Sequence, residues 1–112
     1  MDDLLALLPT NLDALKHRAQ EYQSGTPFPH ISFDDFLPPG VAEAVSRDFP
    51  GPDSDIWQRY ERKGLEYLKL ACDREDRIPP SLRNLLYALN SATFLDFLSE
   101  LTGIPHLIPD PW

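Results

Sequence analysis

The chain has 112 residues, 42% of them hydrophobic and 11% aromatic, which suffices for one domain with a core and is too apolar for a disordered chain. Its net charge of −8 argues against a nucleic-acid partner, because such binding depends on lysines and arginines that neutralise phosphates. The lone Cys72 excludes an internal disulfide, and no stretch approaches the ~20 apolar residues of a membrane span. We expect one cytoplasmic domain that binds neither nucleic acid nor membrane.

The first half of the chain predicts two helices and a strand between them. Thr10 is a typical N-cap with Asp13 in the first turn, and Gly25 is a typical helix stop. Between them, apolar residues recur at helical spacing: Leu12, Leu15, Ala19 and Tyr22. A short strand is expected over residues 30–33. A second helix is expected between Gly40 and Pro50, with Val41, Ala44, Val45 and Phe49 on one face.

The second half predicts a hairpin and two further helices. Residues 56–60 and 65–70 read as strands around a short loop at 62–64. Two prolines at 79 and 80 begin a helix with a leucine stripe, and Ser91 caps the last helix, which Gly103 ends. The proline-rich tail after Gly103 is expected to be extended. The predicted fold class is α+β, and three short strands suggest part of a larger sheet.

Several residues invite a chemical role, and each has a plainer structural interpretation that we favour. His30 is expected to be a partly buried strand residue with its ring nitrogens bonded to the backbone. Asp34 and Asp35 are expected to form a turn in which one carboxylate caps a short helix. Cys72 has only Arg74 nearby to lower its pKa, so it is not predicted to be reactive.

The aromatic and basic residues of the hairpin could form a stacking face for nucleic acid. They are Trp57, Tyr60 and Tyr67, with Arg59, Arg62, Lys63 and Lys69. The overall charge favours a solvated strand pair with cross-strand aromatic contacts instead.

Five blocks, taken in order, resemble the N-terminal part of bacterial iron(II)/2-oxoglutarate-dependent oxygenases of the prolyl-4-hydroxylase-like group. The blocks are Pro27-Phe28-Pro29-His30-Ile31 with Asp34-Asp35-Phe36-Leu37-Pro38, then Arg59-Tyr60-Glu61, then Ile78-Pro79-Pro80-Ser81-Leu82-Arg83, and finally residues 94–104. The resemblance implies a double-stranded β-helix (jelly-roll) fold, with Fe(II) held by a His-x-Asp pair and a distant His, and 2-oxoglutarate as co-substrate. Residues 1–26 would then be an N-terminal helical segment and residues 27–112 the first part of the oxygenase-like domain.

The three histidines do not supply the family's metal motif. His17, His30 and His106 are followed by Arg18-Ala19, Ile31-Ser32 and Leu107-Ile108, so none begins a His-x-Asp. No catalytic, cofactor-binding or metal-binding residue is therefore predicted, and the jelly-roll barrel is expected to be incomplete, truncated before the metal-binding strands.

The leading hypothesis is a fragment of a 2-oxoglutarate/Fe(II)-dependent dioxygenase, a hydroxylase, that is inactive alone. One alternative is a small non-catalytic interaction module, which could be a homo-oligomer. The other is half of a split enzyme whose partner is the missing C-terminal half.

Overall fold

The computed structural model describes residues 2–62 and 66–109, with side chains over residues 4–58 and 69–109. Helices predominate, and one antiparallel sheet makes the architecture α+β. In chain order the elements are α1 (Asp2–Leu5), α2 (Leu12–Leu15), the 3-10 helix η1 (Lys16–Arg18), α3 (Ala19–Gln23), α4 (Val41–Asp48), β1 (Gln58–Arg62), β2 (Glu66–Ala71), the 3-10 helix η2 (Glu75–Arg77), α5 (Pro80–Leu89) and α6 (Ala92–Thr102).

Helices α5 and α6 begin where the sequence predicts, and α6 also ends there. Pro80 occupies the first turn of α5, where its missing N–H costs nothing. The Ser91 hydroxyl accepts a hydrogen bond from the Phe94 backbone N–H at 3.3 Å, which caps α6. Gly103 ends α6 with φ at 78°, a left-handed conformation that favours glycine. Helix α4 also matches its prediction and begins after Gly40, whose φ is 87°.

The predicted N-terminal helix is present in three pieces, α2, η1 and α3, and ends before Gly25 as expected. The prediction that Thr10 caps this helix is wrong. Because α2 begins at Leu12, the N-cap position falls to Asn11, which makes no side-chain capping bond. Asp13 instead forms an ion pair with Lys16, with 3.1 Å between its Oδ1 and the lysine Nζ.

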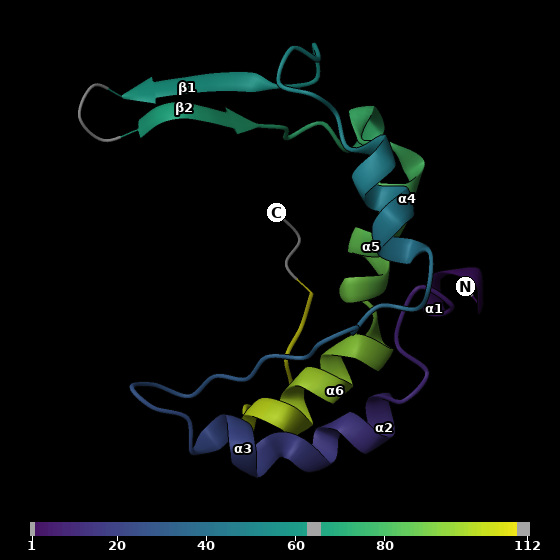
Figure 1. Cartoon of the computed structure of the whole chain (residues 1–112), viewed down its shortest axis with the longest axis vertical. Helices are drawn as coiled ribbons and strands as arrows, with labels where there is room; N and C mark the ends of the chain where they lie inside the picture. The colour runs from purple at the N-terminus through teal and green to yellow at the C-terminus, as the bar shows by residue number, and fades with distance from the viewer. Residues whose placement is uncertain (1, 63–65, 110–112) are drawn as a thin grey trace.

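The strand predicted at residues 30–33 is wrong: this stretch is a loop that runs from α3 past α6 to α4 (Figure 1). Among the described residues its backbone joins no sheet, and side chains hold it instead. Ile31 and Phe33, together with Phe36, pack against the core formed by the helices. The apolar alternation that resembles a strand therefore reflects loop side chains that alternate between core and solvent.

Residues from the N-terminal and C-terminal parts of the described chain pack together in one hydrophobic core. Its buried residues are Leu8, Leu12, Ala88, Phe97 and Leu101, so the segment before residue 27 and the segment after it share one core. Four phenylalanines form an aromatic cluster, here defined as Phe33, Phe36, Phe94 and Phe97. Its ring centroids lie 5.4 to 6.2 Å apart, the separation typical of favourable aromatic pairs. The Arg18 guanidinium lies 5.0 Å from the Phe33 ring centroid, within cation–π range.

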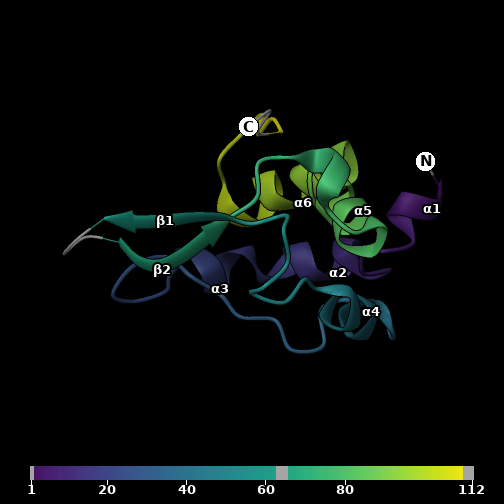
Figure 2. The ribbon, with the colours of Figure 1, turned by 90° about the horizontal axis from the view of Figure 1, so that it is seen from above.

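The predicted hairpin is present, with its strands shifted by one or two residues. Strands β1 and β2 are antiparallel, Gln58 opposite Ala71 and Arg62 opposite Glu66, with an irregular step between Tyr60 and Arg62. The predicted connecting loop lies mostly in residues 63–65, outside the described part. Figure 2 shows the hairpin projecting beyond the helices. Within residues 2–62 and 66–109 each strand pairs only with the other, so each has one free edge.

The molecule is open in shape. Figure 1 shows α5 beside α4 along the right-hand side, with the hairpin extending from their upper end and α6, packed on α2 and α3, at the lower end. The radius of gyration is 16.6 Å, whereas a compact domain of this length has about 13 Å. Among the described residues, no helix is both long and apolar enough to cross a membrane.

Candidate functional site

The three histidines lie in three different segments: His17 in η1, His30 in the loop after α3, and His106 in the segment after α6. His30 Nδ1 lies 2.9 Å from the Phe28 carbonyl oxygen, so the predicted bond between its ring and the backbone is confirmed. The prediction of a partly buried strand residue is wrong, because His30 is exposed and its loop joins no strand.

The described residues do not fit the Fe(II) that the resemblance implies for the complete enzyme. The sequence holds no His-x-Asp. In the described part, no three His, Cys, Asp or Glu side chains gather closely enough to hold a metal ion. We therefore assign no metal ligand and no catalytic step to these residues.

Asp34 and Asp35 form the predicted turn, and Asp35 has φ at 51°, the left-handed conformation that Asp tolerates better than most residues. The predicted helix cap is wrong. The next helix, α4, begins six residues later, and its N-cap Gly40 makes no side-chain bond. Both carboxylates are exposed, which leaves the pair as a solvated turn.

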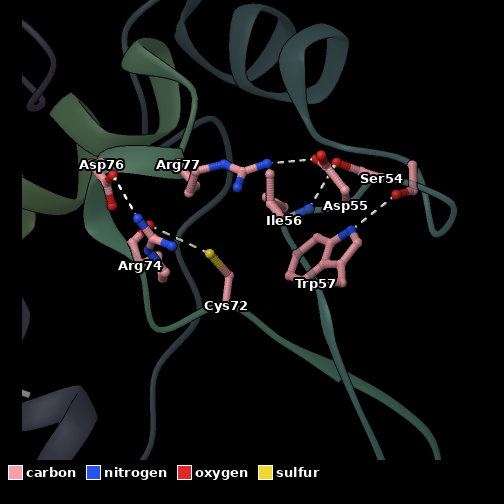
Figure 3. A network of polar contacts seen from close by, with 9 residues as sticks. Ser54, Asp55, Ile56, Trp57, Cys72, Arg74, Asp76 and Arg77 are labelled. Atoms are coloured by element: carbon pink, nitrogen blue, oxygen red, sulfur yellow. Dashed lines mark hydrogen bonds and ion pairs between the residues drawn. The ribbon is translucent and has the colours of Figure 1, made fainter.

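A polar network joins the segment before β1 to the segment after β2 (Figure 3). Arg77 Nη2 donates to Asp55 Oδ1 at 2.6 Å, and Arg74 Nη2 donates to Asp76 Oδ2 at 3.2 Å. The Cys72 thiol donates to the Arg74 carbonyl at 3.5 Å. The Arg77–Asp55 contact ties the two ends of the hairpin to one another, and the other two contacts lie within the segment after β2. We call this network the clasp at the hairpin's base.

Trp57 makes its contacts outside this clasp. Its Nε1 donates to the Gly51 carbonyl at 2.9 Å, and its ring lies 6.0 Å from that of Phe49. It is therefore held within the loop that precedes β1. The predicted cross-strand contacts of Tyr60 and Tyr67 lie outside the described side chains.

Lys16 links the N-terminal helices to α6, a contact that sequence reasoning missed. Its Nζ lies 3.1 Å from Asp13 Oδ1 and 3.2 Å from Glu100 Oε2. The hydrogen bond to Asp13, followed by that to Glu100, raises the pKa of Lys16 above its ordinary value. The sequence does not indicate that Lys16 pairs with a residue of α6, because this contact depends on how η1 packs against α6.

Asp48 and Ser81 connect α4 to the start of α5. The Ser81 hydroxyl donates to Asp48 Oδ2 at 2.8 Å, and Arg47 Nε lies 3.2 Å from the other carboxylate oxygen. The Ser81 bond, followed by the Arg47 bond, lowers the pKa of Asp48 below its ordinary value. An anion near the first turn of α5 also complements the helix dipole.

Replacing Ser81 with alanine is expected to destabilise the fold near neutral pH and to have a smaller effect in acid. The folded-state pKa of Asp48 is depressed, so its stabilising effect is present above the unfolded pKa of about 3.9 and is lost as pH falls through the lower folded value. Urea midpoints measured between about pH 7 and about pH 2.5 test this. The exposed Ser46→Ala serves as the control, and a Ser81→Ala deficit that stays constant with pH would contradict the mechanism.

Comparison with known proteins identifies no relative: no family model, curated protein or solved structure matches this chain.

Proposed function

We propose that this chain is the N-terminal portion of a jelly-roll oxygenase of the iron(II)/2-oxoglutarate type, a hydroxylase that is inactive without the strands carrying its metal ligands. The proposal rests on the resemblance of the five sequence blocks. The structural observation that supports it most is the hairpin: β1 and β2 pair with each other and, among the described residues, with nothing else.

An isolated two-stranded hairpin is marginally stable in water, and free strand edges are templates for further pairing. Figures 1 and 2 show the hairpin standing away from the helices, so neither α4 nor α5 covers these edges. Further strands of a barrel would satisfy the free backbone groups. This would make β1 and β2 the first strands of a larger sheet.

The helices would brace that sheet from one side. Arg77, in η2 just before α5, is joined to Asp55 before the hairpin, and α5 is joined to α4 through Ser81 and Asp48. The resembling stretch 28–38 is tied to α6 through Phe33 and Phe36. In this arrangement the chain's own residues position a sheet and supply no chemistry. Substrate hydroxylation, with the co-substrate 2-oxoglutarate, belongs to the complete enzyme.

The coding sequence beyond the Trp112 codon tests the proposal. We expect it to continue in frame to a His-x-Asp and a later His. The longer product should then convert 2-oxoglutarate to succinate in an Fe(II)-dependent reaction, and residues 1–112 alone should not. Turnover by residues 1–112 alone would overturn the proposal. A stop codon with no such motif downstream would overturn it in favour of the interaction module, and a separate gene carrying the motif would favour the split enzyme.

A further inference from the structure

A second feature, independent of the proposed oxygenase role, lies between the segment after β2 and helix α5. It is a cavity of about 350 Å³, toward the small end of the range for small-molecule sites. Its apolar wall is formed by Cys72, Ile78, Leu86 and Tyr87. Its charged lining consists of Arg83, Asp73 and Glu75. The cavity thus combines an apolar surface with charges of both signs.

Among the described side chains that line this cavity, Arg83 is a cation without an ion-pair partner. Arg74 binds Asp76, and Arg77 binds Asp55, so the guanidinium groups of both neighbours are occupied. Arg83 lies half-buried in the cavity wall and has no carboxylate partner within the part of the chain that the structure describes. A guanidinium offers a planar, forked set of donors that matches a carboxylate, so Arg83 is suited to hold one.

Asp73 and Glu75 add the opposite charge. Asp73 Oδ1 accepts one hydrogen bond, from Gln58 Nε2 at 3.4 Å, and Glu75 has no ion pair among the described residues. A simple anion would meet these two carboxylates, and a simple cation would meet Arg83. A ligand with both an ammonium and a carboxylate avoids both conflicts, because charge complementarity across a site determines which ligand it accepts.

We propose that this cavity binds a free α-amino acid with an apolar side chain. Arg83 pairs with the ligand carboxylate, Asp73 and Glu75 receive its ammonium, and the side chain lies against Ile78, Leu86 and Tyr87. The three parts of such a ligand match the three parts of the lining.

Titration of the 112-residue chain with L-phenylalanine, followed by amide chemical shifts, tests the proposal. We expect saturable shifts confined to the segment after β2 and to α5 around Arg83, Leu86 and Tyr87. Two analogues of L-phenylalanine separate the charges: 3-phenylpropionate lacks the ammonium, and phenethylamine lacks the carboxylate. Each should bind at least about tenfold more weakly, because each loses a charge-assisted contact.

Variants locate the contact. Arg83→Gln should weaken L-phenylalanine binding by at least about tenfold. Arg47→Gln, which removes an exposed guanidinium on α4 outside the cavity, should leave binding unchanged. The proposal is overturned by the absence of saturable shifts at millimolar ligand, by equal binding of 3-phenylpropionate, or by unchanged binding in Arg83→Gln. Because the analogues are tested on the unaltered chain, the experiment decides even if Arg83→Gln does not fold.

Discussion

Replacing Phe97 with alanine is expected to lower the urea midpoint of this domain strongly. Phe97 is 3% exposed and contacts Phe33, Phe36 and Phe94 within the aromatic cluster. Truncating a buried phenylalanine costs about 3–5 kcal/mol, which is a large part of the total stability of a typical domain. Because the lost ring also supports Phe33 and Phe36, the loop over residues 31–36 should lose its anchor. Urea denaturation followed by circular dichroism measures the effect.

Two variants make this test specific. Phe28→Ala removes the same side chain where it is 63% exposed and should leave the urea midpoint nearly unchanged. Phe97→Leu keeps an apolar side chain in the core and should cost markedly less than the alanine variant. If Phe97→Ala and Phe28→Ala shifted the midpoint equally, Phe97 would not be part of the stabilising core.

Leu8→Ala is expected to destabilise the domain by about 2–5 kcal/mol, the usual cost of truncating a buried leucine. Leu8 is 2% exposed and lies in one core cluster with Ala88 of α5 and Leu101 of α6. Its removal should therefore weaken the packing of both C-terminal helices, although Leu8 precedes them by most of the chain. Urea denaturation gives the free energy of unfolding, and amide exchange in α5 and α6 should become faster.

Leu5→Ala provides the matched control from the same segment. Leu5 is 40% exposed, so its truncation should change stability by no more than about 0.5 kcal/mol. Equal effects of the two substitutions would mean that the N-terminal segment does not dock through Leu8.

Elements with strong local signals were predictable. Pro80, Ser91 and Gly103 mark the ends of α5 and α6, because caps and a fixed proline φ act within one helical turn. The sequence could not show that residues 30–33 form a loop and not the predicted strand. Whether an extended segment becomes a strand depends on a neighbouring backbone, and here Ile31 and Phe33 find a core instead. Leu8 carried no signal either, since a short apolar run does not reveal what it packs against.

For the candidate sites too, local features could be predicted from the sequence, and contacts between distant residues could not. From the sequence it was possible to see that the histidines lack the His-x-Asp spacing, because that motif is local. The contacts between Lys16 and Glu100 and between Asp48 and Ser81 join residues far apart in the chain, and so does the pairing of Arg77 with Asp55. The last of these bears on the proposed amino-acid site, because it occupies Arg77, while Arg83 is left without a partner among the described residues.

By itself, the sequence determined α4, α5, α6, the hairpin and the absence of a His-x-Asp motif, since caps, periodicity and spacing are properties of neighbouring residues. Only the tertiary structure decided that residues 31–36 anchor a loop to α6, that the described hairpin strands have free edges, and that a charged cavity opens beside α5. These outcomes depend on which distant segments come into contact, and that depends on the packing of the whole core.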